Sequence, residues 1–483
     1  MNTWQWECFD EVVTADRFGV TNAGPLTAPV RGFSVARDDK MQLVLETLAP
    51  GDARGSMVEH PAGTVRRTEE FVEFAGRSGA TAVARGVAPL GNTHTRNSEG
   101  VKETRERARV QWLTAWLKPG AEPAHTVDWL ENVDGGSQVW NGTFIEDEDE
   151  ATKTRVIGSG ADAIRLSSNR GGVSVGHAAL EMNIGGVPLH LCTAGAEVAG
   201  KHRHPGYIIY RGNPDDATRK KIRDVLAFCL GCYLVHLGHT TLCPNSEVIA
   251  TSARSAYSIG GRVFEIPPSP PAPLGTRYEN EVDQQTLSRM ADAIYANYDE
   301  LEFGGLSWAY WHAVCAPAHM AAAHFGAAIE ALQSAYVRSH PEKFRTKIIG
   351  DRKTWDALRG ELLKAVSGAG LDRSAQIVIA NKISNLNQMP RGATSEQLLS
   401  DLGLQLGPIE RAAWQKRNTA AHGGRMADDD AIMDVIRQTK LLKILLCRMV
   451  LSMTGASESY HDYYTIGLPT RRVTEPVPSP PSV

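Results

Sequence analysis

A proline-rich run divides this chain into two parts with different residue patterns. Five prolines lie within residues 267–273, inside the stretch IPPSPPAPLG at 266–275. Proline lacks a backbone N–H and fixes φ, so such a run favours an extended spacer over a helix or a central strand. We therefore expect a linker at 266–275 between a region at 1–265 and a region at 276–460, followed by a tail at 461–483.

The region before the proline run carries segments typical of β-strands. They are short, rich in β-branched or aromatic residues and bounded by Gly, Asn or Pro, and they lie at 41–48, 81–87, 138–145, 172–184, 187–192 and 207–211. Two longer segments, 102–117 and 215–237, are expected to form helices. Residues 1–265 are therefore predicted to be a β-rich sensor or regulatory region with two helical insertions, in one or two subdomains.

After the proline run, apolar residues recur at helical spacing. Phe325, Ala328, Ile329, Leu332 and Tyr336 form one stripe, and segments 355–366, 377–386 and 428–453 repeat the pattern. Helices of this length with short connections indicate an up-and-down bundle. The predicted fold class is α+β, with a β-rich N-terminal region followed by an all-α helical bundle.

The charge is distributed unevenly along the chain. The net charge is −4, and residues 1–275 hold 28 Lys and Arg against 32 Asp and Glu, whereas residues 341–448 hold 18 against 12. The whole-chain acidity therefore does not exclude a nucleic-acid partner for the helical region. Candidate contacts to an RNA backbone are Lys343, Arg345, Lys347, Arg352 and Lys353.

Cysteine usage and hydropathy indicate a cytoplasmic protein without a membrane segment. The seven cysteines are scattered, and their odd number does not suggest a disulfide framework. The longest apolar runs, 225–235 and 441–451, are too short or carry charges. The first residues lack the basic stretch and apolar run of a secretory signal.

One motif in the helical region suggests chemistry. Pro408 and the pair Gly423-Gly424 bracket a predicted helix, whose last turns carry Arg417, Asn418 and His422. Arginine offers a permanent forked charge for phosphate, and histidine exchanges protons near pH 7. RNA cleavage needs a base for the 2′-hydroxyl, an acid for the leaving 5′-oxygen and cations for the phosphorane. A symmetric dimer would supply two histidines. A structural alternative is that Arg and His merely favour the helix C-terminus.

The stretch RNTAAH at 417–422, at the end of one helix and before a long one, resembles the HEPN superfamily, and within it the ApeA-like proteins of prokaryotic anti-phage defence. The resemblance covers about residues 290–455. It implies a metal-independent endoribonuclease without a cofactor, active as a homodimer or higher even oligomer. The implied catalytic pair is Arg417 and His422, with Asn418 as polar partner. Glu330 loosely matches an acidic residue of the second helix, and Lys416 is a further supporting candidate.

Under this resemblance the N-terminal region would restrain or trigger the nuclease in response to an unknown trigger or inhibitor. Two alternatives remain open. The helical region could be a non-catalytic dimerising module that binds RNA or protein, or the chain could be a toxin held inactive by a partner.

Two other groups of residues have competing interpretations. Cys232, His236, His239 and Cys243 could bind zinc, although thiols on an apolar helix are more simply core residues, so we expect no metal. Trp308, Tyr310 and Trp311 could stack on bases, although packing is the simpler role.

Overall fold

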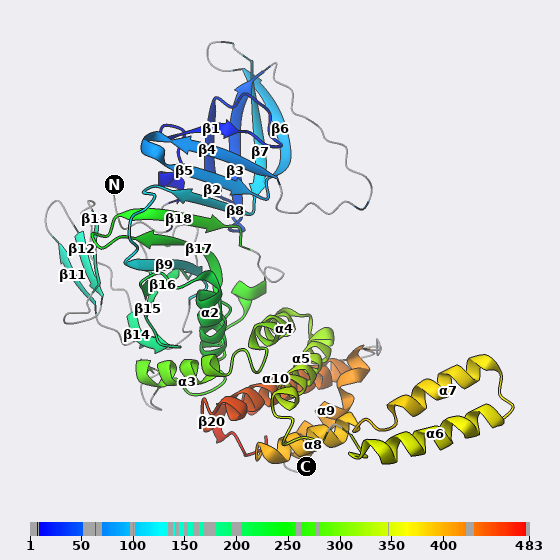
Figure 1. Cartoon of the computed structure of the whole chain (residues 1–483). Helices are drawn as coiled ribbons and strands as arrows, with labels where there is room; N and C mark the ends of the chain where they lie inside the picture. The colour runs from blue at the N-terminus through cyan, green and yellow to red at the C-terminus, as the bar shows by residue number, and fades with distance from the viewer. Residues whose placement is uncertain are drawn as a thin grey trace. The chain divides into compact units, whose positions relative to one another are not determined.

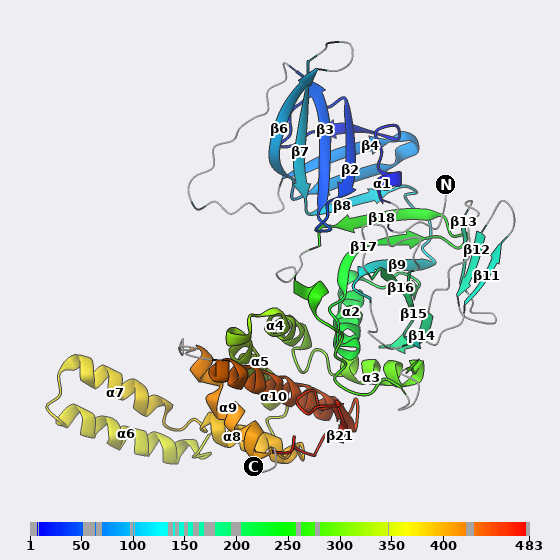
Figure 2. The same cartoon turned by 180° about the vertical axis from the view of Figure 1, so that it is seen from behind.

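The computed structural model divides into two compact units, Met1–Tyr295 and Ala296–Val483 (Figures 1 and 2). It describes residues 7, 9–51, 63, 70–96, 100, 102–133, 139–140, 144–148, 153–157, 164–168, 179–194, 204–256, 262–275, 281–345, 347–421 and 429–479. The N-terminal unit is rich in antiparallel sheet and the C-terminal unit is helical, so the predicted α+β class is confirmed at this level.

A ten-stranded antiparallel sheet forms the centre of the N-terminal unit. Its order is β1 (Phe18–Asn22), β4 (Phe71–Gly76), β5 (Thr81–Arg85), β8 (Trp112–Trp116), β18 (Val248–Arg254), β17 (Val235–Leu242), β9 (His125–Glu131), β16 (Gly206–Arg211), β15 (Val187–Thr193) and β14 (Ala179–Ile184). A second antiparallel sheet has the order β2 (Gly32–Arg37), β3 (Leu43–Pro50), β7 (Lys102–Val110) and β6 (Ala88–Arg96). The rings of Phe33 and Phe74 meet at 4.7 Å between the two sheets.

The remaining elements of this unit are smaller. β10 (Val139–Trp140) pairs with β19 (Glu281–Val282), and β11 (Phe144–Glu148), β12 (Lys153–Ile157) and β13 (Ile164–Ser168) form a meander. The helices are α1 (Phe9–Val12), α2 (Asp216–Leu230) and α3 (Gln284–Ala296).

The helix predicted at 102–117 is wrong. These residues form β7 and β8, and in β7 Thr104, Glu106, Ala108 and Val110 are buried while the residues between them are not. Burial at every second position is the signature of a strand. The exposed residues that alternate with this buried set, and that form the solvent side of the strand, are Arg105, Arg107 and Arg109.

The helix predicted at 215–237 is correct only in its first part. Asp215 caps α2 by accepting a hydrogen bond from the Thr218 N–H, and the helix ends at Gly231, whose φ of 66° is left-handed. The chain then enters β17, so His236 and His239 lie on a strand. The cysteines and histidines that seemed to share one helix are therefore on different elements.

The expected linker at 266–275 is wrong as well. Ala272 and Leu274 are fully buried, and the Ser269 N–H donates to the carbonyl of Gly231 at the end of α2. A Cβ on Gly231 would lie 2.1 Å from the backbone of Ser269, so the proline run packs tightly on the helix end. The proline run is therefore a packed segment of the N-terminal unit. The boundary between the two units falls between Tyr295 and Ala296.

The C-terminal unit is built around α5 (Ala318–Ser339), which contacts α4 (Phe303–Cys315), α8 (Arg391–Asp401), α9 (Pro408–Ala421) and α10 (Asp429–Thr454). The predicted apolar stripe of α5 faces the core, because Phe325, Ala328, Ile329, Leu332 and Tyr336 are all buried. Helices were therefore predicted correctly here, including α9 from Pro408 onward.

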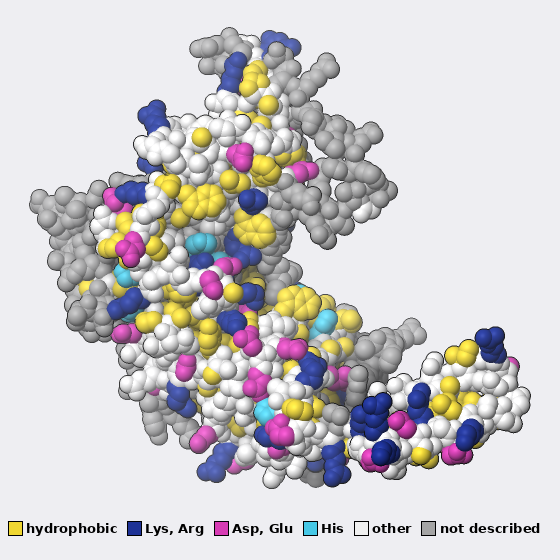
Figure 3. All heavy atoms as spheres, viewed as in Figure 1, with side chains coloured by type: hydrophobic (Ala, Val, Ile, Leu, Met, Phe, Trp, Pro, Cys, Tyr) yellow, Lys and Arg dark blue, Asp and Glu magenta, His cyan; other side chains and the backbone are white. Residues whose placement is uncertain are grey.

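Helices α6 (Arg352–Gly368) and α7 (Arg373–Asn385) form a hairpin that extends away from this core within the unit (Figures 1 and 2). No residue of α6 is buried, so its predicted apolar stripe does not face a core. Figure 3 shows apolar and basic side chains side by side along the hairpin. At the base, the Ile348 N–H donates to the carbonyl of Asn387, and the Asn387 side chain bonds Ile349 in both directions.

The expected tail is instead packed on the helices as far as the structure describes it. β20 (Ser459–His461) and β21 (Thr470–Arg472) pair, and Val473 and Val477 are buried. The fully buried Arg448 of α10 donates to the carbonyls of Val473 and Gln405 and to Glu410 of α9. This arginine therefore connects the C-terminal segment to the start of α9. In the described part of the chain, no helix is long and apolar enough to cross a membrane.

Candidate functional site

Arg417 of α9 donates three hydrogen bonds, two to α5 and one within its own helix. Its Nε and Nη2 donate to Oε1 of Glu330 at 3.0 and 2.7 Å, and its Nη1 donates to the carbonyl of Trp414 at 2.7 Å. The guanidinium also lies 3.8 Å from the centre of the Trp414 ring. A guanidinium has five N–H groups, so one on each Nη is left for another acceptor. The side chain is 19% exposed, which leaves it accessible.

Close approach of α5 and α9 places Arg417 beside Glu330. Gly326 lies one turn before Glu330, and a Cβ there would come within 3.2 Å of Cβ and Cδ of Arg417. That distance is tighter than ordinary van der Waals contact, so the glycine leaves room for the arginine. Glu330, which the resemblance suggested, is therefore the direct partner of Arg417. Gly326 was not predicted, and its only signal was a glycine inside an apolar helical stripe.

A cavity of about 660 Å³ opens next to Arg417, between α5, α8 and α9. We call it the α5–α8–α9 cavity. Val337, Leu399, Leu406 and Trp414 give it an apolar lining, while Arg411, Gln333, Ser395 and Arg417 contribute polar groups. Its volume is within the range of pockets that bind small molecules, about 300–1,000 Å³.

Other predicted site residues fall into three groups. His422 lies outside the described residues, and the side chain of Asn418 is not described. Lys416 is exposed on α9. The predicted basic stretch is exposed from the segment after α5 to the first turn of α6, where Lys343 pairs with Asp401 and Arg352 with Asp356.

The aromatic cluster separates into buried and exposed members. Tyr310 and Trp311 are buried, and the Tyr310 ring meets Phe325 of α5 at 6.0 Å. Trp308 is 65% exposed and stacks on His312 at 3.9 Å. Only Trp308 is therefore available to a partner.

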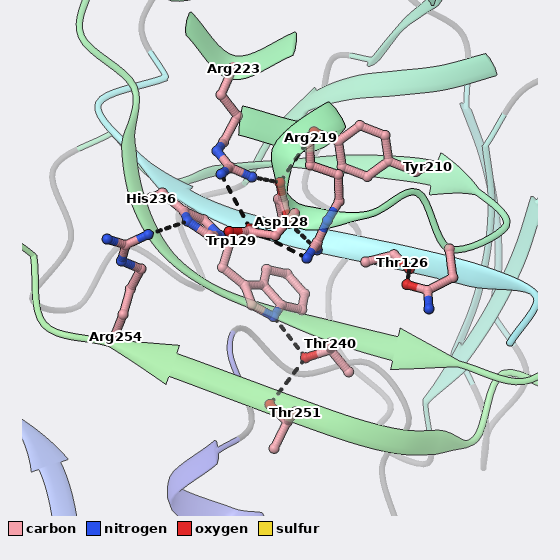
Figure 4. A network of polar contacts seen from close by, with 12 residues as sticks. Thr126, Asp128, Trp129, Tyr210, Arg219, Arg223, His236, Thr240, Thr251 and Arg254 are labelled. Carbon is pink, nitrogen blue, oxygen red and sulfur yellow. Dashed lines mark hydrogen bonds and ion pairs between the residues drawn. The ribbon is translucent and has the colours of Figure 1, made fainter. Parts of the chain in front are cut away.

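A second polar cluster lies in the N-terminal unit around Asp128 of β9 (Figure 4). Asp128 is fully buried and accepts hydrogen bonds from Arg219 and Arg223 of α2 and from the Tyr210 hydroxyl of β16. Nε2 of His236 lies 3.7 Å from its Oδ1. Both arginines also lie within 3.6 Å of Asp216, so the cluster ties α2 to the sheet.

The protonation states in this cluster follow from burial and charge. Burial alone would raise the pKa of Asp128, but Arg223, His236 and Arg219 outweigh it, so this pKa lies well below its usual value. Burial and Arg223 lower the pKa of His236 to about 3, and burial and Arg219 lower that of His239 to about 4. At neutral pH the cluster therefore holds a charged aspartate, charged arginines and neutral histidines.

Ligand atoms of Asp128, His236 and His239 lie within 4.8 Å of one another, the spacing of a metal site. The surrounding groups do not suit a cation. Arg254 donates to Nδ1 of His236, which places the ring proton on Nε2, the atom facing Asp128. The Asp128 oxygens already accept from two cationic arginines, so a metal would meet a protonated nitrogen and like charge.

These three residues include only two of the four possible zinc ligands named from the sequence. The group brings His236 and His239 together, but neither Cys232 nor Cys243 belongs to it. Cys243 instead donates to Oδ1 of Asn245. Sequence reasoning missed Asp128, Arg219 and Arg223, because nothing in the spacing of these residues indicates that β9 and α2 meet.

We compared the chain with family profiles, curated proteins and solved structures, and none of the three gives a match.

Proposed function

We propose that the C-terminal unit is a metal-independent endoribonuclease of the HEPN type, with Arg417 and His422 as its catalytic residues. The observation that supports this most is the arginine held by Glu330 and Trp414 at the edge of the α5–α8–α9 cavity. Four residues separate Arg417 from His422, so the two lie close in the chain.

Each residue has a defined role in this reaction. One histidine takes the proton from the 2′-hydroxyl, whose oxygen attacks the phosphorus, and the bond from phosphorus to the 5′-oxygen breaks. A second histidine gives that oxygen a proton. The two remaining N–H groups of Arg417 stabilise the charge that develops on the phosphorane. Glu330 is a positioning residue, because it holds the guanidinium in one orientation.

A single chain supplies one histidine at this motif, so the proposal includes a homodimer in which His422 of each copy serves one site. The N-terminal unit would restrain the nuclease until a trigger arrives, as in a toxin or anti-phage defence protein. An unrestrained cytoplasmic ribonuclease would destroy the RNA of its own cell. The resting protein is therefore expected to have low activity.

Cleavage of total RNA by the purified chain in the presence of a chelator tests the proposal. Activity is expected with 2′,3′-cyclic phosphate or 3′-phosphate ends, either in the resting protein or after release of the restraint. His422→Ala and Arg417→Ala should abolish it. His324→Ala removes an exposed histidine of α5 and is the matched control. Equal cleavage by His422→Ala and the native chain would refute the proposal.

A second candidate function is a non-catalytic dimerising module. It is favoured by the exposed apolar side chains of the α6–α7 hairpin, among them Leu358, Ile377, Val378 and Leu386, each at least 44% exposed. Dimerisation without RNA turnover under any condition, in the native chain, would favour this candidate over the nuclease.

A further inference from the structure

The outer edge of the ten-stranded sheet at β14 is covered by side chains of α3 instead of by another strand. In the described part of the chain, β14 pairs only with β15, and α3 lies beside β14 (Figures 1 and 2). An outer strand leaves every second pair of N–H and C=O groups without a strand partner, and such an edge can pair with another chain. The outward groups of β14 therefore need other partners.

Three side chains of α3, spaced by four residues, bond three alternate residues along β14 and into its turn. The pairs are Oε1 of Gln284 with the N–H of Glu181 at 3.2 Å, Oγ of Ser288 with the N–H and the carbonyl of Asn183 at 3.2 Å each, and Oδ1 of Asp292 with the N–H of Gly185 at 2.8 Å. Four residues of a helix rise about 6.0 Å, and two residues of a strand advance about 6.7 Å. Because these two periods nearly match, α3 presents hydrogen-bonding groups at the spacing of a neighbouring strand.

The contact between α3 and the edge of β14 is polar and open to water. All four hydrogen bonds are exposed, and the two elements enclose a cavity of about 350 Å³ that only polar and charged side chains line. The opposite side of α3 is apolar, with Leu287 and Ile294 fully buried. Exposed hydrogen bonds contribute little net free energy because water competes for them. The apolar side therefore holds α3 in place, and the polar cap over the edge is weak.

The capped groups of β14 are arranged symmetrically about Asn183. Glu181 and Gly185 lie two residues before and after it, and in an antiparallel pair the residues that exchange hydrogen bonds also recur every two residues. Two copies of β14 can therefore pair across a twofold axis at Asn183, with Glu181 of each copy opposite Gly185 of the other. In this register the charged Glu181 faces a glycine, so no like charges oppose each other.

We propose that α3 is a releasable cap that imitates a strand, and that the edge of β14 beneath it is a docking surface for β14 of a second copy of this chain. With the cap in place the edge is closed. When α3 moves away, the same backbone groups pair with the second copy. In the proposed nuclease, which needs two chains, this pairing would bring two copies together. That link rests on the proposed function, whereas the docking surface does not.

Self-association of the full-length chain, measured by sedimentation velocity over a range of concentrations, tests the proposal. The triple variant Gln284→Ala, Ser288→Ala, Asp292→Ala removes the capping side chains. Its dissociation constant for self-association should fall about tenfold or more, because the closed state loses its hydrogen bonds to the edge. The double variant Gln285→Ala, Arg289→Ala is the matched control, since both residues are exposed on α3 and neither side chain bonds β14 in the described residues. It should associate like the native chain.

Two further changes identify the surface that associates. Leu287→Ala with Ile294→Ala loosens α3 from its apolar side and should also strengthen self-association. Asn183→Pro removes the central N–H of the edge, which points toward Ser288 and away from β15. Proline is tolerated at such an outward position of an edge strand, but it prevents a twofold pair there. Added to the triple variant, Asn183→Pro should return self-association to the native level. Circular dichroism and thermal melting check that every variant folds.

Hydrogen exchange on peptides covering residues 179–186 gives a second readout. In the triple variant the exchange of these amides should be faster than in the native chain at low concentration, and protection should return as the chain associates. Unchanged self-association in both loosened variants, or association that Asn183→Pro leaves in place, would overturn the inference.

RNA cleavage, measured in parallel, separates this inference from the nuclease. If no variant cleaves RNA but Asn183→Pro reverses the association, the docking surface stands and the nuclease proposal fails. If the native chain cleaves RNA and both loosened variants associate like the native chain, the nuclease stands and the docking surface fails.

Discussion

Replacing His236 with glutamine should weaken the dependence of stability on pH in the N-terminal unit. His236 is 89% buried in its side chain, and its pKa of about 3 compares with 6.5 for an ordinary histidine. The unfolded chain therefore binds a proton that the folded chain rejects. The stability that the folded chain gains from a neutral His236 is therefore fully present above about pH 6.5 and is lost as the pH falls toward about 3.

The size of the effect follows from the two pKa values. At about pH 5, His236 is almost fully protonated in the unfolded chain and almost fully neutral in the folded chain. The free energy of unfolding of the native chain is therefore about 2 kcal/mol lower than at pH 7.5. Glutamine can still accept the hydrogen bond from Arg254 but does not titrate. His236→Gln should therefore lose about 2 kcal/mol less than the native chain over the same range.

The assay is urea unfolding of the full chain at both pH values. Pulsed hydrogen exchange with mass spectrometry on peptides from β9 and β17 restricts the signal to this unit. His94→Gln removes an exposed histidine of the same unit and is the control. If native chain and His236→Gln lose equal stability on acidification, the assigned neutral state of His236 is wrong.

Three further variants test the C-terminal unit. Glu330→Gln keeps the shape of the side chain but removes the charge that orients Arg417, so kcat/KM for RNA cleavage should fall about tenfold to a hundredfold. The free energy of unfolding, followed by thermal melting, should change by less than about 1 kcal/mol. Gly326→Val should force Arg417 away from α5 and lower cleavage with helix content unchanged, whereas Gly305→Ala, with open space around its Cβ, should be neutral in both assays. Arg448→Met leaves the fully buried Glu410 without its partner, so chemical denaturation should show a loss of about 3–5 kcal/mol; Arg448→Met with Glu410→Gln should lose less, and an equal loss would contradict the buried pair.

Local patterns predicted the helices of the C-terminal unit well, because one buried stripe is enough to define α5, and Pro408 marks the start of α9. They failed where tertiary contacts decide the structure. Residues 102–110 contain strong helix formers, yet pairing with β3 and β6 makes them a strand. The proline run looked like a linker because its contacts with the end of α2 are not visible in the sequence.

The candidate site shows the same division. The spacing of Arg417 and His422 and the resemblance pointed to the motif, and to Glu330 as a loose match. The contact of Arg417 with one carboxylate oxygen of Glu330, the role of Gly326 and the α5–α8–α9 cavity depend on how α5, α8 and α9 pack. In the Asp128 cluster, sequence reasoning considered His236 and His239 but missed Asp128, Arg219 and Arg223, since the members come from four strands and a helix that meet only in the folded sheet.

The bonds at the base of the α6–α7 hairpin make this arm a separable piece of the chain. Lys347 and Gln388 form an antiparallel bridge, and Asn387 connects to Ile349 with both of its side-chain polar atoms. The chain therefore leaves the core and returns to it at nearly the same point. A short turn between Lys347 and Gln388 could replace the whole α6–α7 hairpin. The hairpin could then be deleted or exchanged while the packing of α5, α8 and α9 is retained.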